Sequence, residues 1–443
     1  MKNHLIPRCY DSHVHWLETG RISDWLNLKN LQSVEEVFSL KTSLPEGHWV
    51  LGFGWDQNQW ASQKWPHRSD LDRAFPHHPV VFFRADGHAL WANTQALIQA
   101  GLPTDASLFS LTPEGGEILR DEAGGIQGVF IDRAMDLITP HLPQLQETQI
   151  QHFLIKAMRV FHQRGFTHIR DMSCSSEQWN EVVHLDESGL LLLAVEQWFD
   201  AEDPKDYKKA LDLAIRARQQ KGLLNVRPCG LKVFFDGALG SEGAFLSQPY
   251  KNSKDHRGIC LMSNDFLQDI LVTAWEQQVP VAVHCIGDEA VHQVALTALK
   301  VQEERQLKGT LHLEHVEMVR SETVPLLKRL SVSCYLQPCH WLTDKAFLEP
   351  KLGELKKWTF PWRLLQEHQV PFYFGSDSPI EEPSLKWTKK ALEESAQNGW
   401  PPLMGDPFSF HSHPDESWAS NSFTEIDENE NVCRVVFRGQ TLN

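Results

Sequence analysis

The chain has neither the long apolar runs of membrane proteins nor the cysteine spacing of a disulfide framework. No apolar run approaches the roughly 18 residues that a membrane-spanning helix needs. The eight cysteines are scattered and no CxxC occurs, a pattern that in a chain of this size indicates reduced thiols. The N-terminal MKNHLIPRCY has no apolar core of the kind found in a secretory signal. We therefore expect a cytoplasmic protein.

The chain also has fewer basic than acidic residues. Lys and Arg total 42 against 58 Asp and Glu, which gives a formal net charge of −16. Because phosphate binding needs a basic face, this balance argues against a nucleic-acid partner and against an anionic membrane surface. Hydrophobic residues make up 41% of the chain, enough for a substantial core. We expect a small-molecule substrate. The composition is compatible with a homo-oligomer.

Short apolar runs alternate with helical patterns through most of the chain. The runs are typical of buried parallel strands and cover residues 165–171, 190–196, 230–235, 279–284, 310–315, 330–337 and 370–375. Helical patterns cover residues 149–163, 204–220, 265–277, 289–305, 321–330 and 385–397. With an opening strand that ends near His13, this alternation predicts an α/β fold, a closed (β/α)₈ barrel of the TIM type.

The expected barrel is interrupted once and followed by a tail. Residues 1–47 would hold its first strand and helix, and residues 48–143, rich in Trp, Gly, Pro and His, would form a large insertion after that strand. Residues 144–400 would complete the barrel. We expect residues 401–443 to form an irregular C-terminal tail with one strand, near residues 432–438.

Metal-ligand side chains fall at the predicted strand ends. His13 and His15 form His-Val-His, and alternate residues on a strand point the same way. The other candidates are Lys232, His284, His315 and Asp377, each at or just after a strand. Because the carboxyl ends of barrel strands carry the active site, these residues together predict a metal centre there.

Lys232 fits such a centre only in a modified form. A free lysine is cationic and repels a metal, but two nearby divalent cations favour the neutral amine. The neutral amine can add carbon dioxide and become a carbamate, an anionic bridging ligand. The alternative is a lysine that pairs with Asp236 or Glu314. Two divalent cations set against Asp377, the carbamate and a hydroxide leave one positive charge, which would stabilise an oxyanion.

These residues resemble the amidohydrolase superfamily, specifically its amidohydrolase-3 (YtcJ-like) branch of metal-dependent hydrolases. The matching segments are DSHVHW, GFGWDQNQW, FFRADGHALWANTQAL, LKVFFDGALGSEGAFLSQPY, VHCIGDEAV, LEHVEM, LQPCHW and FGSDSPI, in family order across residues 9–383. The resemblance implies His13 and His15 on one metal, His284 and His315 on a second, and carboxylated Lys232 as the bridge. It implies that Asp377 is a ligand that also accepts a proton from the attacking water.

Parts of the family pattern are missing. Because the His-Val-His motif begins at residue 13, we expect the β-sandwich that usually flanks the barrel to be absent or reduced to a remnant. Glu242, Glu289 and His312 stand where relatives often carry arginine, which leaves the substrate class open.

Further residues are candidates for the substrate pocket. The resemblance places the inserted segment over the barrel mouth, where His88 would contact substrate. Asp236 and Gln337 are further candidates near the mouth, and His340 is expected to donate a hydrogen bond in the transition state. Glu314 adjoins a candidate ligand histidine and would hold either a metal-bound imidazole or Lys232 in place, or else cap a helix.

The leading hypothesis is a metal-dependent hydrolase in which a metal-activated hydroxide cleaves an amide or other C–N bond. Two divalent ions, with zinc as the expected metal, would be its cofactors, together with the carbon dioxide bound by Lys232. Asp377, Lys232 and His340 would be its catalytic residues. The alternatives are an ester or lactone hydrolase, a mononuclear deaminase on the same barrel, and a catalytically silent metal-binding relative.

Overall fold

Eight parallel strands form the centre of the computed structural model, which describes residues 3–201, 203–330 and 332–442. The strand order is β15-β14-β13-β12-β11-β10-β9-β2. Their bounds are β2 (Tyr10–Val14), β9 (His168–Asp171), β10 (Ala194–Asp200), β11 (Val226–Phe234), β12 (Val281–Cys285), β13 (Leu311–His315), β14 (Ser333–Leu336) and β15 (Phe372–Phe374). This arrangement confirms the predicted (β/α)₈ barrel.

The barrel closes between β2 and the segment that follows β15. The Asp377 amide donates to the His13 carbonyl at 2.8 Å, and the His15 amide donates to the Ser378 carbonyl at 2.7 Å. A parallel bridge joins Val14 to Ser378. The hydrogen bonds that close the barrel therefore fix the backbone positions of His13 and Asp377 relative to each other. These two candidate ligands are far apart in the sequence.

Amphipathic helices surround the strands. Helix α4 (Glu147–Gln163) buries Ile150, Leu154, Ala157 and Phe161 on one face, the spacing of a helix that packs on a barrel. The other helices of the described chain outside the insertion are α1 (Trp16–Arg21), α5 (Ser176–Glu187), α6 (Tyr207–Gln219), α7 (Asn264–Glu276), α8 (Asp288–Glu304), α9 (Val324–Leu330), α10 (His340–Leu352), α11 (Trp362–Glu367) and α12 (Leu385–Gln397).

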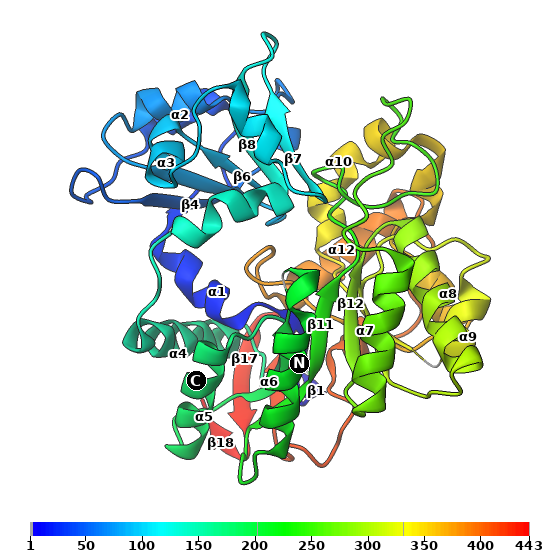
Figure 1. Cartoon of the computed structure of the whole chain (residues 1–443). Helices are drawn as coiled ribbons and strands as arrows, with labels where there is room; N and C mark the ends of the chain where they lie inside the picture. The colour runs from blue at the N-terminus through cyan, green and yellow to red at the C-terminus, as the bar shows by residue number, and fades with distance from the viewer. Residues whose placement is uncertain (1–2, 202, 331, 443) are drawn as a thin grey trace.

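A second, six-stranded sheet lies above the upper ends of the barrel strands (Figure 1). Its order is β3-β4-β5-β6-β8-β7. The strands are β3 (Leu26–Asn27), β4 (Val50–Trp55), β5 (Val80–Arg84), β6 (Ala89–Ala92), β7 (Gly116–Arg120) and β8 (Ile126–Asp132), with helices α2 (Arg68–Ala74) and α3 (Thr94–Gln99). Trp55, Trp60 and Trp91 are buried in a core of its own. This sheet positions the loop between β5 and β6 at the barrel mouth.

Both ends of the described chain meet in a small antiparallel sheet. Strand β1 (His4–Pro7) pairs with β16 (Phe423–Ile426), which pairs with β17 (Val432–Phe437) and then β18 (Gln440–Thr441). The tail thus holds three strands where the sequence predicted one. The pattern of β16 is only four residues long and its partner β1 lies at the other end of the chain, so no local signal marks it.

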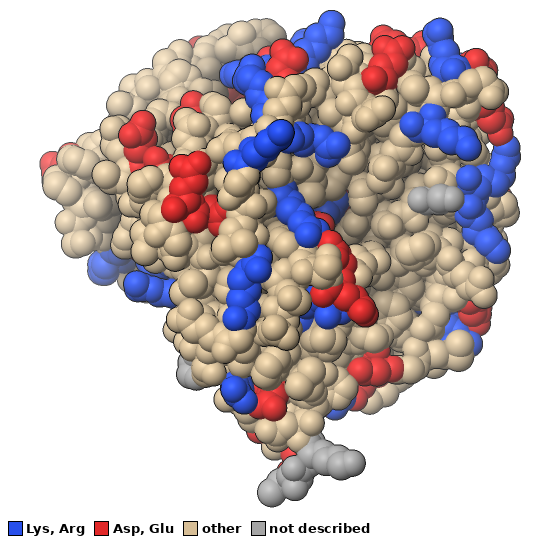
Figure 2. All heavy atoms as spheres, turned by 90° about the horizontal axis from the view of Figure 1, so that it is seen from below, with Lys and Arg blue, Asp and Glu red and all other residues tan. Residues whose placement is uncertain are grey.

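The outer surface carries both signs of charge. Seen from below, Lys and Arg side chains are interspersed with Asp and Glu side chains (Figure 2). Among the described residues, no helix combines the length and apolarity that crossing a bilayer requires.

Candidate metal centre

The six predicted ligand residues all lie at the carboxyl ends of barrel strands. His13 is the fourth residue of β2 and His15 follows that strand directly. The remaining four come from other strands: Lys232 lies on β11, His284 on β12 and His315 at the end of β13, and Asp377 follows β15. Since the strands are parallel and in one closed sheet, their side chains converge at one mouth.

Three of these side chains form a group with the spacing of metal ligands. Asp377 Oδ1 lies 3.2 Å from His15 Nε2 and 3.5 Å from His13 Nε2. One ligand atom from each residue lies within 4.8 Å of the others. Two imidazole nitrogens and a carboxylate oxygen at this separation suit a small divalent cation.

A second pair of imidazoles lies beside this group. The ring centres of His284 and His315 are 4.4 Å apart, and His315 is 4.6 Å from His13. Lys232 reaches the same region with a fully buried side chain. The four imidazoles and Asp377 therefore lie close together, and Lys232 comes from β11, the strand next to that of His284.

Unpartnered buried atoms test whether these residues fit a metal. His13 Nε2, His284 Nε2, Lys232 Nζ and Asp377 Oδ1 are buried without a hydrogen-bond partner among the described residues. Leaving such atoms unsatisfied is costly. Their types are those that ligate a divalent cation, with the lysine as the one exception in its unmodified form. The donor set fits a metal centre.

Polar partners orient the ligand rings. His13 Nδ1 is hydrogen-bonded to Glu314 Oε2 at 2.6 Å, and His15 Nδ1 to Ser173 Oγ at 2.8 Å. His315 Nδ1 donates to Gln337 Oε1 at 3.1 Å. When Nδ1 carries the proton, the lone pair lies on Nε2, so the oxygens of Glu314 and Gln337, which can only accept, favour the tautomer that binds a metal.

The electrostatic environment favours the neutral form of three of the four candidate ligand histidines, whereas Asp377 outweighs burial and raises the pKa of His15. Burial lowers the pKa of His13 to about 4 and holds the pKa values of His284 and His315 well below their usual range. Burial also lowers the pKa of Lys232. Burial alone would raise the pKa of Asp377, but the neighbouring His13 and His15 rings lower it. Neutral imidazoles and a carboxylate are the states that coordinate a cation.

Two ligand residues adopt unusual backbone conformations. His315 has φ of 69° and Asp377 has φ of 60°, in the left-handed region that residues other than glycine rarely adopt. Such conformations cost about 1–3 kcal/mol each and gather at functional sites. Here they turn the chain at the ends of β13 and β15 so that both side chains reach the mouth.

His340 begins α10 and faces Asp377 from the side opposite His15. Its Nε2 lies 3.8 Å from Asp377 Oδ2, and its Nδ1 is hydrogen-bonded to Glu317 Oε1 at 2.8 Å. Burial would lower the pKa of His340, but Glu317 outweighs it and raises the pKa to about 10. The structure therefore presents a protonated imidazole, a strong hydrogen-bond donor, at the mouth.

His88 comes from the inserted sheet and reaches the same mouth. It lies in the loop between β5 and β6, and its ring centre is 5.1 Å from that of His284. Asp132, at the end of β8, is hydrogen-bonded to His88 Nδ1 at 2.7 Å. The fold thus places His88 beside the candidate ligand cluster, where a residue that lines a substrate pocket would lie.

Two other predicted pocket residues make different contacts. The Asp236 carboxylate accepts hydrogen bonds at 2.9 Å from the amides of Phe245, Ile286 and Gly287. It therefore holds together the loops after β11 and β12. Gln337 is buried and holds His315, as described above. Both side chains are buried, and Asp236 Oδ1 lies 3.8 Å from His284 Nε2.

The sequence did not single out several partners of these residues. Arg170, Ser173, Glu317 and Asp132 contact a predicted site residue or its partner only through the folded barrel. The one local signal is Arg170, a charged residue inside the apolar run that forms β9. Charge within a buried strand calls for an ionic partner.

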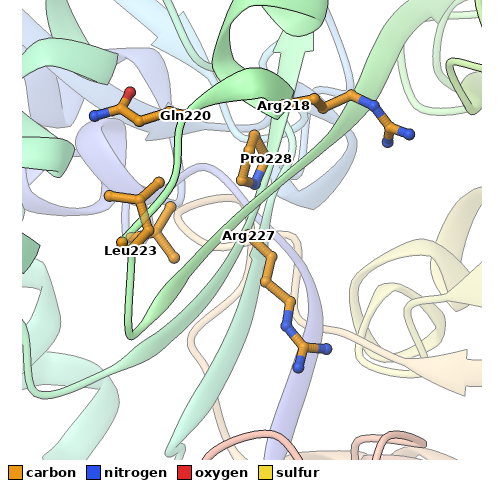
Figure 3. Close-up of a pocket in the computed structure, with 7 residues that line it drawn as sticks. Arg218, Gln220, Leu223, Arg227 and Pro228 are labelled. Atoms are coloured by element: carbon orange, nitrogen blue, oxygen red, sulfur yellow. The ribbon is translucent and has the colours of Figure 1, made fainter.

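A surface hollow of about 360 Å³ lies at the other end of the barrel, beside the start of β11 (Figure 3). Arg218 and Arg227 are among the residues that line it. Both guanidinium groups are already engaged, Arg218 with the Cys229 and Gln278 carbonyls and Arg227 with Asp415. The hollow is separate from the ligand cluster.

An eight-stranded barrel with histidines and an aspartate gathered at its strand ends defines the class of metal-dependent hydrolases. The sequence profile described as Amidohydrolase family matches residues 3–387. The chain belongs to this family, and the family implies a divalent metal at the cluster.

Individual relatives agree with this assignment. The chain is 28% identical over 416 residues to a Bacillus subtilis (strain 168) protein called YtcJ, whose name gives an amidohydrolase but no substrate; the match covers 89% of this chain and 75% of YtcJ. It is 24% identical over 413 residues to an N-substituted formamide deformylase of Arthrobacter pascens, covering 88% and 74%. The structure of an uncharacterized metal-dependent hydrolase from Pyrococcus furiosus matches with a TM-score of 0.64 at 26% identity, covering 88% and 77%.

Proposed function

We propose that this protein hydrolyses an amide or other C–N bond in a small molecule at a centre of two divalent ions, with zinc as the expected metal. His13 and His15 would hold one ion, His284 and His315 the other, and Asp377 and a carboxylated Lys232 would complete the set. The observation that carries the proposal is the convergence of unpartnered buried nitrogen and oxygen atoms on one volume.

Lys232 supports the bridging part of the proposal. Its Nζ has no hydrogen-bond partner among the described residues, so it forms neither of the pairs with Asp236 or Glu314 that would explain a bare amine. Burial lowers the pKa of Lys232, which favours the neutral amine. Its nitrogen lone pair would form a bond to the carbon of carbon dioxide and release one proton. The resulting carbamate carries the negative charge and the two oxygens that a bridge needs.

Each other residue has a role that follows from its contacts. When bound, the ions would supply an activated water and polarise the scissile carbonyl. Asp377, with Oδ1 unpartnered, would accept the proton of the water and return it to the leaving amine. His340 would donate a hydrogen bond to the developing oxyanion, and Glu317 would hold it for that purpose. His88 would contact the substrate.

The preference for C–N bonds rests on the family and on one relative. The Arthrobacter pascens protein is named an N-substituted formamide deformylase, and that reaction cleaves a C–N bond. We expect protein loaded with zinc and bicarbonate to hydrolyse some members of a panel of N-formyl and N-acyl amines. The panel should include the matching esters and lactones.

The panel separates the proposal from its alternatives. Turnover of amides, lost in Asp377→Asn, would support it. Turnover of esters or lactones alone would keep the metal chemistry but contradict the bond class. Release of ammonia from amino-substituted rings, with no amide cleavage, would favour a deaminase. Metal-loaded protein that turns over none of these would contradict the proposed function.

A further inference from the structure

The barrel interior below the metal centre holds an ion pair where barrels of this type usually pack branched apolar side chains. Arg170 on β9 and Glu314 on β13 have fully buried side chains, and Arg170 Nη1 donates to Glu314 Oε2 at 2.9 Å. The same Glu314 oxygen is hydrogen-bonded to His13 Nδ1 at 2.6 Å. One carboxylate oxygen therefore joins the arginine to a candidate metal ligand.

Arg170 also contacts the backbone beside that ligand. Its Nη1 reaches the Ser12 carbonyl at 3.4 Å, and Ser12 is the residue before His13. Arg170 thus acts on His13 in two ways. It contacts Glu314, the partner of the His13 ring, and it contacts the main chain of the preceding residue. Among the described residues, no other arginine is hydrogen-bonded to a partner of a candidate ligand ring.

Aromatic rings hold the guanidinium in place. The Arg170 guanidinium carbon lies 3.8 Å from the ring centre of Tyr335 on β14 and 4.4 Å from that of Trp198 on β10. Glu196 contributes a second, longer ionic contact at 3.9 Å. Strands β10 and β14 are not neighbours in the sheet, so the side chain crosses the barrel interior. Such a clamp limits the movement of the arginine and of the carboxylate it holds.

Burying this ion pair is not explained by stability alone. Removing two charges from water is costly, and apolar side chains of similar volume often stabilise a core as well or better. A role toward the metal centre accounts for the arrangement, because partners of metal-bound histidines set ring orientation and affinity.

We propose that Arg170 is a positioning residue for the first metal site: it holds Glu314 and the Ser12 carbonyl, and through them fixes the imidazole of His13. The inference rests on the proposed function, in which His13 is a ligand. Arg170 touches neither substrate nor metal and acts only through its neighbours.

The test is the zinc affinity of metal-free protein, measured by competition with a chromophoric chelator. Arg170→Met removes the charge while keeping an unbranched chain of similar length. We expect it to weaken one of the two zinc sites by about 10- to 100-fold, the loss typical of removing such a partner. Arg170→Lys keeps the charge and should recover part of that affinity.

The matched control is Arg227→Met. Arg227 also pairs with a carboxylate, Asp415, and lies over an indole ring, that of Trp418 at 4.2 Å, but it contacts no candidate ligand. We expect this variant to bind zinc as the wild type does. Thermal unfolding of the metal-free proteins identifies any variant that has lost its fold, in which case Arg170→Lys and Glu314→Gln carry the test.

A double-mutant cycle gives the decisive comparison. If Arg170 acts through Glu314, then Arg170→Met combined with Glu314→Gln should lose little more affinity than the weaker-binding single variant. Fully additive losses, or a folded Arg170→Met that binds both zinc ions as tightly as the wild type, would overturn the inference. Wild-type protein that binds no zinc would instead contradict the proposed function, so the two failures are distinguishable.

Discussion

At the scale of single residues, the candidate centre depends on side chains whose polar atoms have no use in the fold. Asp377 Oδ1 and Lys232 Nζ are buried without a hydrogen-bond partner among the described residues, whereas the buried Asp236 carboxylate accepts hydrogen bonds from backbone amides. The first kind of atom is available for a metal or a substrate and the second is not.

Asp377 is the residue whose replacement should affect turnover most directly. Asp377→Asn keeps the shape of the side chain but removes the base that accepts a proton from water. We expect kcat to fall by at least the roughly 10²–10⁴-fold that general acid–base groups contribute, with the fold intact by circular dichroism. The assay uses the best amide from the panel. A variant with near-normal kcat would show that another group is the base.

Lys232 provides a second prediction at this scale. Lys232→Ala should lose activity and at least one metal per chain, and acetate should restore part of both by supplying a bridging carboxylate. Lys232→Arg should not be rescued, because guanidinium stays cationic and cannot take up carbon dioxide. Metal content by elemental analysis and kcat with and without acetate are the measurements.

Asp377→Asn is the control for the acetate experiment, since acetate should not restore it. Full metal occupancy and activity in Lys232→Ala without acetate would mean that the lysine is not a bridge.

The position of the candidate ligand residues at strand ends could be predicted from the sequence, but most of their hydrogen-bond partners could not. His13, His284 and Asp377 each stand at a strand end, where the barrel rule places active-site residues. By contrast, His13 and Glu314 are 301 positions apart and meet only when the barrel closes. The sequence left Glu314 between two roles for that reason, and it did not mark Ser173 as the partner of His15.

At the scale of elements, closure of the barrel between β2 and β15 sets the geometry of the first site. Gly375 lies directly after β15, and a Cβ atom placed there would come within 2.5 Å of the His13 backbone nitrogen and 3.0 Å of its Cβ. The close approach of the two strands therefore requires glycine at this position.

Gly375→Ala should separate the two strands and move His13 away from Asp377. We expect a loss of about 1–3 kcal/mol in the free energy of unfolding, typical of overpacking, together with weaker zinc binding. The control is Gly399→Ala, where φ is 96° and no atom lies within 4 Å. The control should lose stability through backbone strain but keep its zinc affinity. Unchanged zinc affinity in folded Gly375→Ala would show that the closure tolerates more space.

Elements of regular periodicity could be predicted closely. The expected helix at residues 385–397 matches α12, and the expected strand at residues 310–315 matches β13 to within one residue. Strand β10 lies further along than the apolar run at residues 190–196, at Ala194–Asp200. The reason is physical: the interior of this barrel is polar near Glu196 and Gln197, so part of the strand is not apolar.

The six-stranded sheet was not predicted as a sheet. Its strands are short, its pairing mixes parallel and antiparallel neighbours, and its first strand, β3, has two residues. The partner of β3 is β4, more than twenty positions away in the chain. Local pattern cannot indicate such pairings.

At the scale of the whole molecule, buried histidines outside the metal centre make stability depend on pH. Burial lowers the pKa of His168 to about 3 and that of His411 to about 4, against an ordinary value near 6.5. Below pH about 6.5 the unfolded chain binds protons that the folded chain does not. The stabilisation is therefore complete above that pH and is lost as the pH falls toward 4.

We expect the free energy of unfolding of metal-free protein to fall by about 1.4 kcal/mol per pH unit for each such histidine between pH 6.5 and 4. Urea unfolding at pH 7, 6 and 5 measures it. His411→Gln removes one titrating ring and should reduce the slope relative to the wild type. Identical slopes in the two proteins would contradict the assignment of His411 as a buried neutral ring.

The mouth of the barrel is built from two parts of the molecule. The barrel supplies the six candidate ligands and His340, and the inserted sheet supplies His88 with its partner Asp132. Arg133, which follows β8, pairs with Asp203 of the barrel at 2.5 Å. The insertion is thus fastened beside the residue that it delivers to the site.

The central claim is a centre of two metal ions bridged by a carboxylated Lys232. Anomalous diffraction at the zinc edge, from crystals of protein reconstituted with zinc and bicarbonate, tests it most directly. The account predicts two peaks about 3.5–4 Å apart, one beside His13 and His15 and the other beside His284 and His315, with three extra atoms on Lys232 that touch both ions. A single peak beside a bare Lys232 amine, or no peak at all, would contradict it.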